Sequence, residues 1–419
     1  MTLLLLCSGT FLFIGLKGKN LINPLVVFNG TWFVCFVLYT LELSEAYSNL
    51  ISDKARNVLL TMLVAFNVFY YFGLYIRTKE RRSFLAIIKA TKKEKYLKIL
   101  FFIWLSLIVF EMIYFKGVPL VWRILGRTDV SYVSFGIPSV HGFINSLAWL
   151  ISSLSFMDYL QTRRRENLFY LICINGVFLV LLARQAIVTE VVQLMTILLC
   201  VKKISIKRIV AIIIGFIIAF GLIGNYRTPP EVIINSSGFK YTVPIFLLGI
   251  VWVYMYMVSP LANMINLINH WTNYQYGIIT LNNALPSVIA KGIELKPRGV
   301  VESFLVSETY NMSTGLSGIY EDFGVLGIAL FFAIIGYFGG RLWCKATINK
   351  RSNKNLAIIN YSVYSGAICL LFFFNAFTTL PILMQFVYSN FLFKNYFFIN
   401  KDDAESGEVD LLKGRGGNE

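Results

Sequence analysis

The sequence predicts an all-α integral membrane protein, a polytopic bundle of about eleven transmembrane helices (ten to thirteen) with a large loop region on the outer face. Of its 419 residues, 57% are hydrophobic and 14% are charged, too few charges to cover a water-soluble protein of this size. Many apolar runs approach the ~20 residues that a helix needs to cross the hydrocarbon core. Helices satisfy their own backbone hydrogen bonds in lipid, so these runs predict a helical bundle. The runs cover residues 2–16, 25–41, 57–76, 98–115, 142–160, 168–201, 209–224, 243–260, 323–343, 356–376 and 381–399.

Positive charge sets the expected orientation. Much of the basic excess behind the net charge of +16 lies in short connections between apolar runs, which is a topology signal and not a nucleic-acid-binding surface. We expect the basic connections to face the cytoplasm and the connections 42–56 and 116–141 to face outside. The first run lacks a positive n-region, so we expect a short first helix with an outer amino terminus and no cleavable signal peptide. The basic connections are 77–98, 163–165, 202–208 and 345–354.

The run 168–201 is too long for one straight helix. Its 34 residues would span about 51 Å. Both flanks are basic, so both ends are expected in the cytoplasm and the run becomes a hairpin of two short helices. Its tip falls near Ala183-Arg184-Gln185, which places the cation of Arg184 close to the lipid boundary, where a charge is costly.

The run 243–260 poses the second topological question. If it crossed the membrane, the basic connection 345–354 would face outside, against the charge rule. We therefore predict a re-entrant or interfacial segment, or one of a pair with a weakly apolar segment near 277–290. The expected division of the chain is 1–224 for the N-terminal helices, 225–322 for the outer-face region, 323–399 for the C-terminal helices and 400–419 for a disordered cytoplasmic tail.

Arginine is the outer-face residue type that suggests a binding site. Its guanidinium matches phosphate oxygens bidentately, and positive charge outside runs against the usual bias. Arg123, Arg127, Arg184 and Arg227 therefore fit a site for a lipid-linked pyrophosphate. The alternative is an arginine that reaches to lipid headgroups, which applies most to Arg123 and Arg127.

Other polar residues of the outer region have two readings each. Arg298 and Glu302 are four residues apart, so in a helix they share a face and can pair, as any surface ion pair would. Glu308, Tyr310 and Asn311 form a polar patch suited to sugar hydroxyls, or an ordinary loop.

Asp322 and His270 can also be interpreted either as structural residues or as residues of a functional site. Glu321-Asp322 opens the next membrane helix, where a carboxylate caps free backbone amides. His270, beside Trp271, fits an interfacial aromatic belt.

Absent motifs narrow the chemistry. The chain has two histidines and no Cys/His cluster, so a zinc site is not expected. It has no Walker loop, no dinucleotide-binding fingerprint and no paired-aspartate motif for a nucleotide sugar. We expect no metal and no cofactor. The six cysteines lie in apolar runs or at their inner edges, which predicts no disulfides.

Four stretches carry a family resemblance. They are Leu-Leu-Ala-Arg184-Gln-Ala, Gly224-Asn-Tyr-Arg227-Thr, Tyr256-Met-Val-Ser-Pro260-Leu-Ala-Asn263, and Glu308-Thr-Tyr-Asn311 leading into Gly318-Ile-Tyr320-Glu-Asp322-Phe-Gly324-Val-Leu-Gly327. Together with the topology, they resemble the O-antigen and capsule repeat-unit polymerases (Wzy-type), a divergent family of bacterial membrane glycosyltransferases.

The resemblance implies a metal-independent reaction on the outer face of the bacterial cytoplasmic (inner) membrane. A glycan on undecaprenyl pyrophosphate is transferred to the terminal sugar of a newly flipped lipid-linked repeat unit, to build O-antigen or capsular polysaccharide. Arg184 and Arg227, with Arg298 third, would clamp the pyrophosphate. Asp322, Glu302 or His270 would orient or deprotonate the acceptor. The implied partners are the lipid-linked oligosaccharide, a chain-length regulator and a flippase.

Three other functions stay open. An O-antigen ligase-like transferase has a similar outline. A polysaccharide flippase or secondary transporter needs charged or helix-breaking residues near mid-membrane. Apart from Arg184 and Glu190 in the hairpin, the membrane runs are almost uncharged, and the polar residues gather on one face, which favours interfacial chemistry over transport. A structural or sensor protein is the third.

Overall fold

The computed structural model is all-helical and contains seven helices that are long and apolar enough to cross a membrane, plus two shorter apolar helices. The chain is therefore a multi-pass membrane protein by helix length and composition. The structure describes residues 1–18, 20–45, 51–75, 94–127, 134–202, 230–244, 248–293, 295, 304–306, 310–347 and 354–392, with isolated residues between 204 and 218. Its helices are α1 (Thr2–Lys17), α2 (Pro24–Thr40), α3 (Asp53–Tyr75), α4 (Glu94–Tyr114), α5 (Pro119–Ile124), α6 (Val140–Thr162), α7 (Arg165–Val180), α8 (Arg184–Val201), α10 (Pro230–Ser237), α11 (Leu248–His270), α12 (Ile278–Ala284), α13 (Ser287–Gly292), α14 (Ser317–Thr347), α15 (Lys354–Cys369) and α16 (Leu380–Val387), with short turns η5 (Leu370–Phe372), η6 (Ala376–Thr378) and η7 (Tyr388–Leu392).

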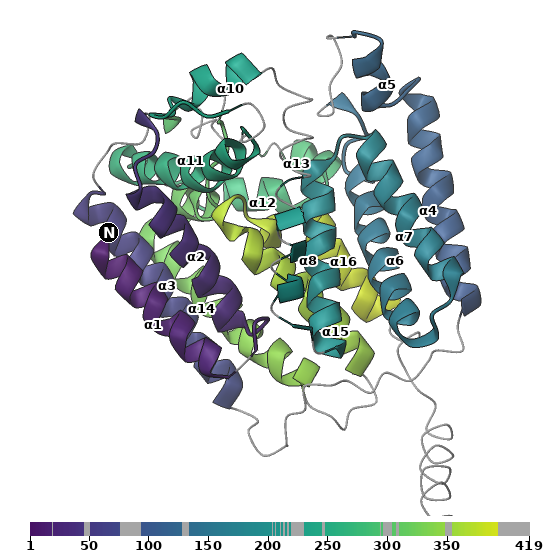
Figure 1. Cartoon of the computed structure of the whole chain (residues 1–419), viewed down its shortest axis with the longest axis horizontal. Helices are drawn as coiled ribbons and strands as arrows, with labels where there is room; N and C mark the ends of the chain where they lie inside the picture. The colour runs from purple at the N-terminus through teal and green to yellow at the C-terminus, as the bar shows by residue number, and fades with distance from the viewer. Residues whose placement is uncertain are drawn as a thin grey trace, which may run out of the picture.

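Helices α1, α2, α3 and α14 form one group in which α3 and α14 approach most closely (Figure 1). Glycines make this contact possible, because a Cβ on Gly336 would lie 2.4 Å from the carbonyl oxygen of Phe66 and one on Gly340 would lie 2.4 Å from that of Tyr70. Small residues that let two backbones meet are a common basis of helix association in lipid.

A second group contains α4, α6, α7, α8, α15 and α16 (Figure 1). Here buried polar side chains join the helices. Gln193 of α8 and Gln385 of α16 exchange two amide hydrogen bonds of 3.0 and 2.8 Å, and the Thr196 hydroxyl donates to Ser365 of α15 over 3.1 Å. Such bonds stabilise helix pairs where no water competes for the polar groups.

The stretch 168–201 is divided into two helices, α7 and α8. The turn is Leu181–Ala183, and the chain enters α8 at Arg184, at the residues that the charge pattern indicated. Leu182 has a φ of 56°, in the left-handed region, and this conformation closes the turn.

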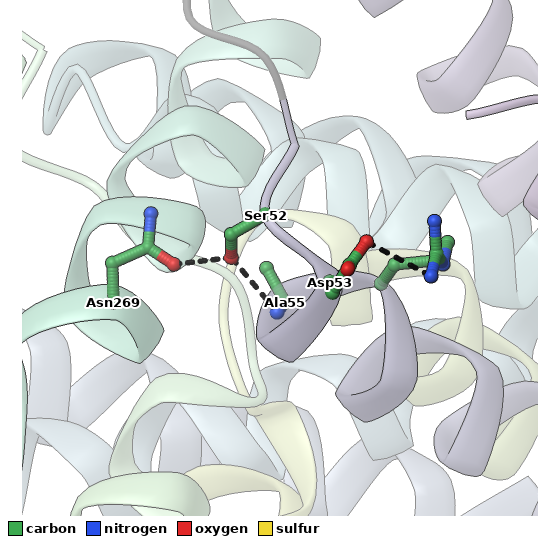
Figure 2. Close-up of polar contacts among 5 residues, drawn as sticks. Ser52, Asp53, Ala55 and Asn269 are labelled. Atoms are coloured by element: carbon green, nitrogen blue, oxygen red, sulfur yellow. Dashed lines mark hydrogen bonds and ion pairs between the residues drawn. The ribbon is translucent and has the colours of Figure 1, made fainter.

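Helix α11 differs from the predicted segment at both ends. It runs from Leu248 to His270 and contains Pro260, so the predicted end at residue 260 is wrong. The backbone N–H of Leu43 donates to the Tyr254 hydroxyl over 3.0 Å, and the Ser52 hydroxyl donates to Asn269 over 2.5 Å. Figure 2 shows the second contact, in which Ser52 also caps α3 by accepting from the N–H of Ala55.

These two contacts show how α11 lies. Leu43 follows α2 and Ser52 precedes α3, so both belong to one connection at one end of the bundle. Tyr254 and Asn269 are fifteen residues apart, or about 22 Å along the helix. Helix α11 therefore lies across this end, as Figure 1 also shows, although its length and composition would let it span a membrane.

The three regions predicted to face outside meet at the same end. Ser44 forms an antiparallel bridge with Phe239, which joins 42–56 to 225–322. The N–H of Ser287 donates to the Ser139 hydroxyl over 2.6 Å, which joins 225–322 to 116–141. This grouping is what a common side of the membrane requires.

Candidate functional site

Arg184 lies above a cluster of aromatic rings. Its guanidinium carbon is 5.8 Å from the ring centre of Trp252 on α11, within the distance of a cation–π contact. Trp252 and Tyr256 lie one turn apart with ring centres 5.4 Å apart, and Tyr310 stands edge-on to both at 6.1 and 6.4 Å. Phe373 completes the group, 5.3 Å from Tyr256. We call these five residues the Arg184 cluster.

In the Arg184 cluster, the half-buried cation of Arg184 packs against uncharged aromatic side chains. Trp252 and Tyr310 are each only 4% exposed. Burial raises the pKa of the Tyr310 phenol, against a smaller opposite effect of a hydrogen bond with Ser236. Tyr310 therefore stays neutral at physiological pH, and Arg184 provides the positive charge of the cluster.

Asn263 on α11 fixes the chain that leads to Tyr310. Its side-chain amide donates to the carbonyl oxygens of Tyr310 and Met312, over 2.9 and 2.6 Å, and its oxygen accepts from the N–H of Val306 over 2.8 Å. One buried side chain thus satisfies three backbone groups, those of Val306, Tyr310 and Met312, and so holds these residues in a fixed place.

Asp322 caps a helix, but a different one from the helix that the sequence suggested. Its carboxylate accepts from the N–H groups of Ile279 and Thr280 over 3.1 and 2.8 Å, and from the Thr280 hydroxyl over 2.6 Å. These groups form the first turn of α12, whereas the prediction placed the cap on the membrane helix that follows Asp322. The prediction failed because the partner is forty-two residues away in sequence.

A kink at Gly324 makes this arrangement possible. Gly324 has φ 61° and ψ −146°, and it divides α14 into a short first part, residues 317–323, and a long membrane segment. A Cβ at this position would lie 2.8 Å from the Tyr274 ring. The backbone N–H groups of Gln275 and Tyr276 donate to the carbonyl oxygens of Glu321 and Asp322, both over 3.0 Å. Asp322 is thereby held fully buried, with its carboxylate directed at α12.

His270 lies at the other end of α11 from the Arg184 cluster. It is eighteen residues from Trp252, or about 27 Å along the helix. Its ring is exposed, stacks on Phe304 with centres 5.7 Å apart, and contacts the carbonyl oxygen of Asn266 over 2.8 Å. Asp322 belongs to this same end, since the carbonyl oxygen beside it accepts from Trp271 over 3.3 Å. Both groups therefore lie near the end of α11 that is opposite Trp252.

The remaining predicted residues divide into surface positions and positions outside the described chain. Arg123 and Arg127 are exposed in and after α5, and Asn311 is exposed although its neighbour Tyr310 is buried. Two members of the predicted sugar-binding patch, Tyr310 and Asn311, therefore do not share an exposed surface. Four predicted residues lie outside the described residues, namely Arg227, Arg298, Glu302 and Glu308.

The sequence reading missed a buried acid in α4. Glu111 is fully buried, and its carboxylate accepts from the N–H of Ile137 over 3.0 Å and lies 2.7 Å from Nδ1 of His141. Glu190 on α8 is also buried and accepts from Asn175 over 3.0 Å. Glu111 carried a signal, because an acid inside an apolar run is itself a reason to expect a partner.

Comparisons with known proteins give no family. No protein-family model, no curated protein and no solved structure matches the chain. Within the described residues, no three His, Cys, Asp or Glu side chains are grouped to hold a metal ion.

Proposed function

We propose that this chain is a repeat-unit polymerase of the bacterial cytoplasmic membrane. In this proposal it has about eleven membrane helices, with residues 225–322 on the outer face. It transfers a glycan from undecaprenyl pyrophosphate to the terminal sugar of a second lipid-linked repeat unit, and so extends O-antigen or capsular polysaccharide. Neither a metal ion nor a cofactor takes part.

The observation that supports the proposal is the composition of the Arg184 cluster. Three of the four stretches that resemble the polymerases contribute to it or to its support, through Arg184, through Tyr256 and Asn263, and through Tyr310. These stretches are far apart in sequence, and the topology alone does not predict that they lie close together.

The chemistry of the cluster suits a pyrophosphate. Glycosyl transfer from this carrier releases a pyrophosphate whose negative charge grows in the transition state, and a fixed cation in a site of low dielectric stabilises that charge. The indole face of Trp252 holds the guanidinium without neutralising its charge, and a guanidinium matches phosphate oxygens bidentately.

The separation along α11 changes the proposed roles of the acids. Because Asp322 and His270 lie at the far end of this helix, we assign Asp322 a positioning role and no proton transfer. Glu302 remains our proposed base, since it precedes the segment that Asn263 anchors. Arg227 and Arg298 remain proposed second and third ligands of the pyrophosphate.

The test is complementation of a deletion strain, with surface glycan sized on a gel. We expect Arg184→Ala to lower long-chain glycan about a hundredfold while single repeat units persist, since removing one group that stabilises transition-state charge costs about 10²–10³ in rate. Arg184→Lys keeps the positive charge but loses the bidentate guanidinium, and it should restore only part of the long-chain glycan. The matched control is Arg163→Ala, because Arg163 makes a similar contact with the Tyr159 ring, at 5.4 Å, but lies in a basic connection.

Unchanged chain length in the deletion strain would overturn the polymerase assignment. A flippase or transporter is the second candidate, and it predicts that single repeat units as well as long chains are lost from the surface of the deletion strain. The buried acids Glu111 and Glu190 in membrane helices favour it over a ligase. Transport predicts that lipid-linked repeat units stay on the inner face in the deletion strain, where an impermeant glycan label cannot reach them.

A further inference from the structure

A groove of about 620 Å³ follows the membrane helices α14, α15 and α16. Its walls are almost entirely apolar, with Ile334 and Phe338 of α14 more than half exposed within it. It lies outside the Arg184 cluster and has no part in the proposed reaction.

The two ends of the groove differ. Lys345, near the end of α14, and Ala357, near the start of α15, line one end. At the other end the rings of Phe331 and Phe377 lie 6.2 Å apart. From Phe331 to Lys345 the groove extends over fourteen residues of one helix, or about 21 Å.

The polar groups in the middle of the groove are satisfied within the protein. The amide of Asn360 donates to Asn390 over 2.9 Å, and the oxygen of Asn360 accepts from the Ser389 hydroxyl over 2.6 Å. Lys345 is exposed, and within the described part of the chain it has no hydrogen bond or ion pair. The groove therefore offers an apolar channel with one available cation at its end.

We propose that this groove binds an anionic phospholipid, with one acyl chain along the apolar channel and the headgroup phosphate at Lys345. The charge is complementary, since cationic groups at the ends of membrane helices attract anionic headgroups. The length also fits, because one leaflet contributes about 15 Å of hydrocarbon and the chain stays in the groove through that depth.

Native mass spectrometry of the purified full chain, with phosphatidylglycerol and phosphatidylcholine as probes, tests the site. We expect phosphatidylglycerol to be retained more strongly, and Lys345→Gln to weaken it about fivefold, the effect of one cation at a membrane surface. Ala357→Trp should fill the channel and weaken both lipids. The controls are Lys240→Gln, which removes a distant exposed charge, and Leu330→Trp, which adds the same bulk at a 57% exposed position of α14 outside the lining.

Three outcomes would overturn the proposal. They are equal retention of the two lipids, the same loss in the control variants, and stronger binding of undecaprenyl phosphate than of phosphatidylglycerol with the same dependence on Ala357. The last would assign the groove to an isoprenoid chain. None of these depends on whether the chain polymerises glycans, so the two proposals fail separately.

Discussion

At the scale of single residues, buried polar side chains hold distant parts of the chain in place through their backbone groups. Asn263 bonds three backbone groups of the chain around Tyr310, and Asp322 bonds two backbone N–H groups and a hydroxyl of α12. In both cases the cost of leaving buried backbone groups unpaired makes the side chain a positioning device. An acid near a predicted site is therefore not evidence of catalysis until its partners are known.

Asp322→Ala is expected to destabilise the protein by about 2 kcal/mol, because it removes a helix cap and leaves buried donors unpaired. Asp322→Asn keeps an acceptor oxygen and should cost less. The measurement is the unfolding midpoint in detergent for both variants beside the wild type. An unchanged midpoint combined with lost polymer would contradict the positioning role and return Asp322 to the chemistry.

At the scale of elements, two types of helix contact hold the bundle. Glycine permits α3 and α14 to touch through their backbones, and amide and hydroxyl pairs join α8 to α15 and α16. Both types of contact are needed because the hydrophobic effect does not drive helices to associate within lipid. The first type depends on the absence of a side chain, so it is the more sensitive to substitution.

Gly336→Ala should lower stability by about 1–3 kcal/mol, since the new methyl group would overlap the Phe66 carbonyl and force the backbones apart. Gly176→Ala on α7 is the control, because no atom lies within 4 Å of the added Cβ. It should be neutral or stabilise by up to about 1 kcal/mol through helix propensity. The measurement is the thermal unfolding temperature of both variants in the same detergent. Equal changes in this temperature would argue against the close α3–α14 contact.

At the scale of the whole molecule, the sequence predicted the grouping of its loops better than its site. Charge and length were enough to place the turn at Arg184, because basic flanks on a run of 34 residues permit few alternatives. They could not reveal that Trp252 lies beneath Arg184 or that Asp322 caps α12, because both contacts join residues distant in sequence. The bounds of α11 were missed because the apolar run ends at residue 260, whereas the packed helix continues to His270.

The meeting of the predicted outer loops gives a direct test. Residues that form an antiparallel bridge have Cα atoms about 4.5–5.5 Å apart, within the range of a disulfide. Ser44→Cys with Phe239→Cys, in a chain whose native cysteines are replaced by alanine, should therefore cross-link on oxidation. Ser44→Cys with Ser287→Cys is the control, since Ser287 contacts Ser139 instead.

An impermeant thiol reagent added to spheroplasts should label Lys240→Cys, an exposed position next to the bridge, if these loops face outside. Failure of Ser44→Cys and Phe239→Cys to cross-link would contradict the fold at this end. Cross-linking without labelling of Lys240→Cys would keep the fold and reverse the orientation.

The position of α11 has a consequence for how the chain is made. An insertion machinery that reads hydropathy would accept this 23-residue helix as a membrane span, yet its partners Leu43 and Ser52 hold it across one end of the bundle. Those partners leave the ribosome long before α11 does, so they are already in place when it emerges. The connection that contains Leu43 and Ser52 can thus guide the placement of α11. If residues 1–224 and 225–419 were synthesised as separate chains, the second chain would have only its own hydropathy to follow.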